Sequence, residues 1–193
     1  KNYETFRPHL EKIVKLKRKE SQLVGMNGHP YNGLLDDFEE GMTAEKVRPI
    51  FQELKEALVK LLSDIEKSDR YKKQRKTLLN RKFDRTLMES FVHDVAFRMG
   101  LEKEKARIDL SEHPFTTKVG IADVRLTTNY RDDPMFSFGS TIHEAGHALY
   151  ELGLPEKEGY SILGDAPSLG IHESQSRFWE NNIGKSRAFW KFY

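Results

Sequence analysis

The chain has 193 residues and a formal net charge of +2, which fits one ordinary domain or a piece of a larger one and gives no reason to expect nucleic acid as a partner. The absence of cysteine excludes thiolate sites, so any metal ion must be bound by His, Asp or Glu. No stretch approaches the roughly 18 apolar residues of a membrane span and no signal peptide opens the chain, so we expect no membrane partner and a cytoplasmic protein.

The sequence of the first half of the chain predicts helices. Residues 3–24 are expected to be helical, and the glycine-rich segment 25–33 is expected to be a loop. Another helix is predicted to begin at Thr43, and its apolar residues recur at helical spacing: Ile50, Leu54, Ala57, Leu58, Leu61, Leu62 and Ile65. A third helix is predicted around residues 87–99. We interpret the basic segments 12–19 and 67–85 as solvated surfaces rather than a nucleic-acid-binding face.

In the second half of the chain, the spacing of apolar residues changes from the helical period to the alternation of a strand. In the segment 121–128, Val124 and Leu126 point to one side of a predicted strand, while Asp123, Arg125 and Thr127 point to the other. Residues 107–110 are expected to pair with this strand. Helices follow from about residue 137 to 152 and from about 168 onward. The predicted class is mainly α with a small β-sheet beside the helix 137–152.

The helix 137–152 contains the sequence His-Glu-Ala-Gly-His at residues 143–147. Because positions i and i+4 share a helix face, His143 and His147 can bind one metal ion, such as zinc. Glu144 lies about 100° further round, where its carboxylate can act as a general base beside the metal. The alternative is two surface histidines on an ordinary helix. Gly146 costs roughly 1 kcal/mol against alanine in a helix interior, which suggests a packing or access requirement.

A catalytic zinc ion usually has three protein ligands and an open position. One class of zinc peptidase has a glycine three residues and a histidine six residues after the second ligand, but Tyr150 and Gly153 occupy these positions here. The other common third ligand is a glutamate on a following helix, and Glu173 fits that role. His172 is the competing candidate, and only one of the two is expected to reach the metal because neighbouring helical positions point about 100° apart.

Four segments together resemble the carboxypeptidase Taq family, also called thermostable carboxypeptidase 1. They are His-Pro-Phe at 113–115, Asp-Val-Arg-Leu-Thr at 123–127, His-Glu-Ala-Gly-His at 143–147 and His-Glu-Ser-Gln at 172–175. They occur in the order and with the gaps that are typical of the family. The zinc motif alone is shared by many peptidases, whereas the four together are specific.

The resemblance implies a metallocarboxypeptidase that releases C-terminal residues from peptides with broad specificity. It implies a mostly helical, zincin-like core, zinc with cobalt or manganese as substitutes, and a homodimer. It also implies His143, His147 and Glu173 as ligands with Glu144 as the base. His172 and Gln175, which lie beside Glu173 in the sequence, are expected to support the ligands from behind.

The chain also departs from the family. Members are much longer, and two motifs that normally follow the ligand glutamate, an Ile-Arg segment and a Gln-Asp-x-His-Trp segment, do not occur here. We therefore expect residues 1–193 to be a truncated catalytic domain, helical over 1–106, with the sheet and the metal-binding helices over 107–193. Two alternatives remain open: a zinc endopeptidase or oligopeptidase, and a metal-binding segment with little activity of its own.

Further residues are candidates for binding the substrate. The polar face of the predicted strand 121–128, with Asp123, Arg125 and Thr127, could meet a peptide that adds to the sheet edge, and Arg125 could hold a carboxylate with two hydrogen bonds. The alternative is an Asp123–Arg125 surface pair. His113 precedes a proline, which holds its backbone extended, and it could donate to the substrate or simply belong to a turn.

The remaining candidates rest on residue type alone. Tyr130 and Tyr160 are conceivable donors to an oxyanion, although no spacing favours either of them. Asp165 could orient a ligand histidine from behind.

Overall fold

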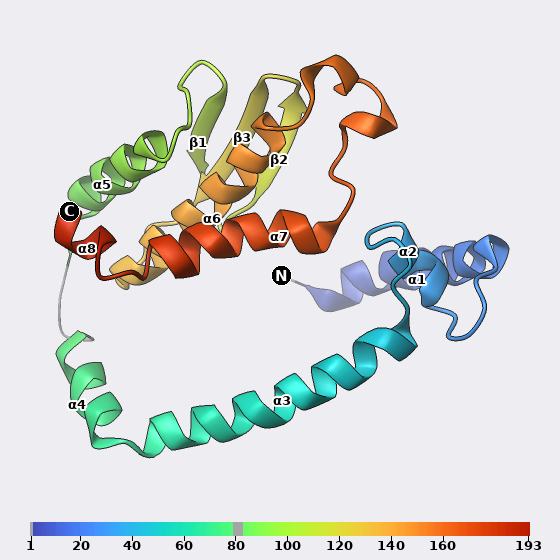
Figure 1. Ribbon diagram of the computed structural model, residues 1–193, viewed down its shortest axis with the longest axis horizontal. Coiled ribbons are helices and arrows are strands. Elements are labelled where there is room, and N and C mark those ends of the chain that lie inside the picture. Colours follow the sequence, from blue (N-terminus) through green and yellow to red (C-terminus); the bar gives the residue numbers. More distant parts are fainter. Residues whose placement is uncertain (1, 79–82) are drawn as a thin grey trace. The chain divides into compact units, whose positions relative to one another are not determined.

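The computed structural model describes residues 2–78 and 83–193, except for the side chains of 74–78 (Figure 1). Its contacts divide the chain into two compact units, Lys1–Gln74 and Arg75–Tyr193. All the sequence motifs quoted above lie in the second unit.

The first unit is helical, as predicted. It contains α1 (Tyr3–Val24), α2 (Asn32–Asp36), α3 (Ala44–Lys67) and the beginning of α4 (Asp69–Leu78). Helix α1 ends at Gly25, whose φ of 69° is left-handed and therefore favours glycine. Helix α3 begins as the sequence predicts, because the Thr43 side chain accepts a hydrogen bond from the backbone N–H of Lys46.

Polar contacts order the loop of this unit. The buried Asn32 side chain donates to the backbone oxygen of Asn27 and to Glu45, and it accepts from the backbone N–H of Ala44. The apolar stripe that identified α3 is exposed among the described residues, notably Ile50, Leu54, Leu58, Leu61, Leu62 and Ile65. No described helix is both long and apolar enough to cross a membrane.

The second unit combines a three-stranded sheet with helices. Its main elements are α5 (Arg85–Arg98), β1 (Ala106–Leu110), β2 (Thr116–Gly120), β3 (Asp123–Thr128), α6 (Pro134–Leu152), α7 (Leu169–Arg177), the π-helical turn η3 (Phe178–Ile183) and α8 (Phe189–Phe192). Helix α6 packs against the sheet on one side and against α7 on another (Figure 1). The prediction of a mainly helical fold with a small sheet beside α6 is confirmed.

The sheet differs from the sequence prediction in one respect. The order is β1-β3-β2, with β1 parallel and β2 antiparallel to β3. Residues 107–110 pair with the predicted strand as expected, but β2 was not predicted. Because β3 is central, both of its backbone edges are already paired. The edges of the sheet, where a peptide could add, are therefore β1 and β2, and contact between the polar face of β3 and a peptide stays a prediction.

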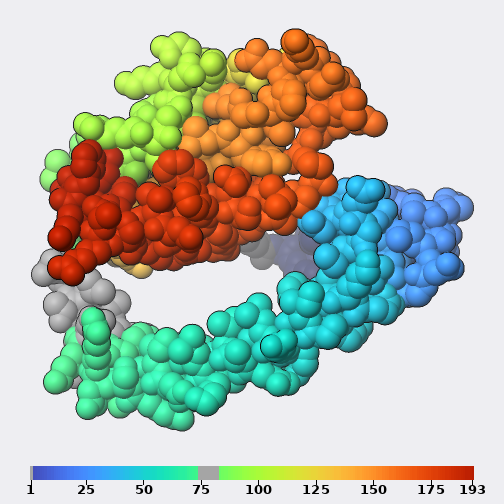
Figure 2. Space-filling model, viewed as in Figure 1, coloured from blue at the N-terminus to red at the C-terminus, as the bar shows by residue number. Residues whose placement is uncertain are grey.

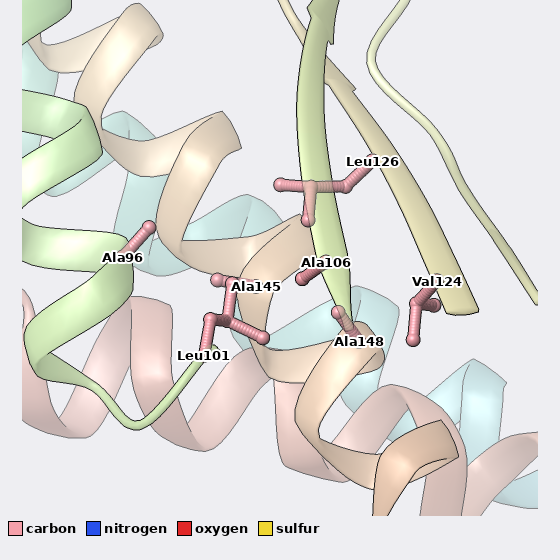
Figure 3. Close-up of a cluster of buried hydrophobic side chains, with 7 residues drawn as sticks. All are labelled: Ala96, Leu101, Ala106, Val124, Leu126, Ala145 and Ala148. Atoms are coloured by element: carbon pink, nitrogen blue, oxygen red, sulfur yellow. The ribbon is translucent and has the colours of Figure 1, made fainter. Parts of the chain in front are cut away.

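The core lies between the sheet and α6. Val124 and Leu126 are fully buried, as the alternation in β3 predicts, and they pack with Ala145 and Ala148 of α6. Figure 3 shows these side chains gathered with those of Ala96, Leu101 and Ala106. The small alanine side chains let α6 approach the sheet closely, so the helix that carries the histidines is fixed by the core.

Aromatic packing holds the other side of α6. Phe138 of α6 contacts Phe189 of α8, with ring centroids 5.2 Å apart, and Phe91 of α5 contacts Tyr193 at 5.4 Å. Figure 2 shows the C-terminal residues, in red, against the green residues of this unit. Helix α5 therefore packs with α6, and its Ala96 joins the core beside the sheet, although the helical part predicted over 1–106 included this helix.

Candidate metal centre

Three side chains converge between α6 and α7. The Glu173 carboxylate Oε2 lies 3.5 Å from Nε2 of His143 and 3.2 Å from Nε2 of His147. One ligand atom from each of the three residues lies within 4.8 Å of the other two. Ligands that bind a tetrahedral zinc ion at about 2.0–2.1 Å are about 3.3 Å apart, so these residues fit a divalent metal.

Gly146 explains how α7 comes close enough. A Cβ atom at Gly146 would lie 2.8 Å from Cα of Ser176 and 3.1 Å from the backbone oxygen of Gln175, which is closer than side chains normally tolerate. The glycine therefore allows α7 to cross directly over the helix turn that carries the histidines. This is the packing requirement that its unfavourable helix propensity suggested. Gln175 contributes its backbone to the crossing, and a role for its side chain stays a prediction.

His147 is buried in a setting that favours a neutral imidazole. Burial lowers the pKa of His147 to about 4, and the neighbouring histidines add to this effect. A metal ligand must offer a neutral ring nitrogen, so this environment suits the role. Its Nδ1 is buried without a hydrogen-bond partner among the described residues.

His172 lies behind the ligands. Its ring stacks on that of His147 with centroids 4.5 Å apart, and its Nε2 lies 2.8 Å from Oε1 of Glu151. It is Glu173, not His172, that groups with the two histidines. This arrangement supports Glu173 as the third ligand, and it places His172 where its ring can hold that of His147 in position.

Glu173 is held by neighbours on its own helix. Its Oε1 accepts a hydrogen bond from Nε of Arg177 at 2.8 Å, and the Ser176 hydroxyl lies 3.0 Å from Oε2. Burial favours the protonated acid, but these hydrogen bonds and the nearby charges of His143 and Arg177 together lower the pKa of Glu173 below its ordinary value. The group is thus kept as the carboxylate that a metal ion requires.

Glu144 occupies a different position, beside the ligands and against the sheet. Its side chain is buried, and Oγ1 of Thr116 on β2 lies 2.6 Å from its Oε2. Burial raises the pKa of Glu144, while the hydrogen bond from Thr116 opposes that shift. A buried carboxylate with a raised pKa, close to but outside the ligand set, has the properties of a general base.

Thr116→Val in the full-length protein is expected to lower kcat/KM about tenfold to a hundredfold, because a hydrogen bond to a charged group contributes roughly 1.5–3 kcal/mol. The Thr116 hydroxyl stabilises the ionised form of Glu144, so its loss raises the pKa of the Glu144 carboxyl. The acid limb of the pH profile of kcat/KM should therefore move to higher pH. The exposed neighbour on the opposite strand face offers the control Thr117→Val, and an unchanged acid limb in Thr116→Val would contradict the assignment.

A cleft of about 350 Å³ opens beside these residues, and its lining includes His113, Arg131, His143 and Glu144. His113 therefore lines the same cleft as His143 and Glu144, and its contact with a substrate stays a prediction. Thr127 is buried and accepts a hydrogen bond from the backbone N–H of Phe115 at 3.0 Å. It therefore holds the His-Pro-Phe segment in place rather than facing the cleft.

The other predicted residues lie outside the cleft lining. Arg125 donates two hydrogen bonds to Asp123, at 2.5 and 2.7 Å, which is the surface pair considered as the alternative. Tyr130 packs into the aromatic cluster, where burial raises its pKa to about 12. Tyr160 and Asp165 are exposed. A role for these residues in substrate binding or metal support stays a prediction.

The geometry defines a class of protein. Two histidines one helical turn apart, a buried glutamate beside the first and a third carboxylate on the next helix are the features of a metallopeptidase with a glutamate ligand. The chain belongs to the carboxypeptidase Taq (M32) metallopeptidase family, whose model matches residues 1–193. The resemblance drawn from the four sequence segments is confirmed.

Individual members of this family are similar to the chain in sequence and in structure. The chain is 40% identical to thermostable carboxypeptidase 1 of Pyrococcus furiosus over 97% of its length, and 39% identical to that of Thermus thermophilus over 96%. It is also similar to the crystal structure of the M32 carboxypeptidase from Deinococcus radiodurans R1, with a TM-score of 0.82, 38% identity and 97% of the chain covered. The chain spans 38% of the length of the two thermostable carboxypeptidases and 37% of the Deinococcus chain.

Proposed function

We propose that the full-length protein is a zinc-dependent carboxypeptidase that removes C-terminal residues from peptides. The observation that carries the proposal is the convergence of His143, His147 and Glu173, with one ligand atom of each within 4.8 Å of the others. The names of its relatives, thermostable carboxypeptidase 1, support a peptide substrate that is attacked at its C-terminus. Zinc is the metal that this donor set of two histidines and one glutamate favours, with cobalt or manganese as substitutes.

Residues of this chain have separate roles in the proposed hydrolysis. When bound, the metal polarises the scissile carbonyl and lowers the pKa of an attacking water. Thr116 engages Oε2 of Glu144, which leaves Oε1 to accept the proton of that water and return it to the leaving amine. His113 lines the same cleft and is the residue we expect to donate to the developing oxyanion.

A pair of peptides tests the exopeptidase assignment. A peptide with a free C-terminal carboxylate should lose residues one at a time, and its C-terminal amide should be cleaved about tenfold to a hundredfold more slowly, because a charge-assisted interaction is lost. Mass spectrometry of timed digests measures both rates. Acetylation of the N-terminus is the control and should change neither rate. Equal internal cleavage of the free and amidated peptides would instead establish an endopeptidase.

A further inference from the structure

Glu180 lies at the metal centre, although it is not among the residues that the sequence predicts for it. It lies in the π-helical turn η3, seven residues after Glu173, so that about two helical turns separate the two and both face α6. Its side chain is only 17% exposed. Its Oε2 lies 3.0 Å from Nδ1 of His143, on the opposite side of the ring from Glu173. The imidazole of His143 thus lies between two carboxylates, one at each nitrogen.

The two contacts on His143 are not equivalent. Glu180 also receives hydrogen bonds from Arg177 and Lys185, each at 3.1 Å, so its negative charge is matched by two cations. A carboxylate can only accept, so the hydrogen bond fixes the proton of His143 on Nδ1. The lone pair of Nε2 is then directed to the side where Glu173 lies, which is the metal side.

Arg177 joins the two carboxylates. Its Nε donates to Oε1 of Glu173 at 2.8 Å, and its Nη1 donates to Oε2 of Glu180 at 3.1 Å. The guanidinium group is planar and rigid, so it sets the position of one carboxylate relative to the other. The contact to Glu173 uses the oxygen that does not face the histidines, which leaves Oε2 for the metal.

We propose that Glu180 is a positioning residue of the metal centre, which holds His143 in its metal-binding tautomer, and that Arg177 couples it to the ligand Glu173. This inference rests on the metal site of the proposed function. Carboxylates that hold a ligand histidine from behind commonly change metal affinity tenfold to a hundredfold when they are replaced. An ion pair that merely attached η3 to the fold would influence stability without influencing the metal.

Zinc affinity of the full-length protein, measured by competition with a chromophoric chelator, separates these roles. Glu180→Gln should bind zinc tenfold to a hundredfold more weakly than the unchanged protein. It should also alter the visible spectrum of the cobalt-substituted protein, because the charge behind His143 is lost. The matched control Lys185→Gln removes a partner of Glu180 and leaves the contact to His143 in place, so it should change affinity less than about threefold.

Arg177→Lys gives an independent test, because lysine keeps the charge but cannot span both carboxylates. It should weaken zinc binding several-fold, between the effects of the other two variants. Unchanged zinc affinity and an unchanged cobalt spectrum in Glu180→Gln would overturn the inference, as would an equal loss in Lys185→Gln. If the unchanged protein bound no zinc at His143, His147 and Glu173, the proposed function itself would fail, which distinguishes the two results.

Discussion

Replacement of Glu144 by glutamine in the full-length protein is expected to lower kcat by about a hundredfold to ten-thousandfold while one metal ion stays bound. The carboxylate lies outside the group formed by His143, His147 and Glu173, so the amide should not disturb the ligands. An amide cannot take a proton from water, however, so the general-base contribution is lost. Steady-state kinetics and metal analysis of the same purified sample measure both effects.

Replacement of His143, the residue before Glu144, provides a variant with a different expected result. His143→Ala removes a ligand and should lose both the metal and the activity, because two of the three ligands do not suffice for a tight site. The pair thus separates loss of the base from loss of the metal at adjacent positions on α6. Normal turnover in Glu144→Gln would contradict the base assignment. Stoichiometric zinc in His143→Ala would contradict the ligand assignment.

The part of the site that lies on one helix, α6, could be predicted from the sequence. The spacing of His143 and His147 determines that they share a face, because the helix has a fixed period. The alternation of Val124 and Leu126 likewise predicted which face of β3 is buried, and both are fully buried. These features depend on local geometry, which neighbouring residues in the sequence determine.

The parts that were missed depend on contacts between elements. Strand β2 lacks an apolar face: Thr116 and Lys118 point inward, and Val119 is exposed. The inward residues are polar because each has a polar partner there, Glu144 for Thr116 and the backbone oxygen of Gly164 for Lys118. A period-2 search for apolar residues cannot find such a strand.

Glu180 was missed for a different reason. Its spacing of seven residues from Glu173 is compatible with the same helix face, and this was a usable signal. Many glutamates on solvated helices share such a spacing, however, so the spacing alone is not specific. Its contact with His143 arises only because α7 and η3 pack against α6, and the packing requires Gly146.

Gly146→Ala is accordingly expected to destabilise the full-length protein, although alanine is normally favoured over glycine in a helix by about 1 kcal/mol. The new Cβ would lie 2.8 Å from Cα of Ser176, so the backbone of α7 must move. Overpacking of this kind costs roughly 1–3 kcal/mol. Because α7 carries Glu173, its displacement should also weaken zinc binding by about tenfold or more. Denaturant unfolding and chelator competition measure the two effects.

The same helix contains the matched control. Gly139 also lies inside α6, but a Cβ there would meet its nearest neighbour, Oε1 of Glu180, only at 4.0 Å. Gly139→Ala should therefore be neutral or stabilising by up to about 1 kcal/mol, as the helix propensity alone predicts. The two substitutions are chemically identical, so any difference in stability or zinc affinity between the variants arises from the close contact of α7 with Gly146. Equal stability and equal zinc affinity in both variants would show that Gly146 does not control the approach of Glu173 to the histidines.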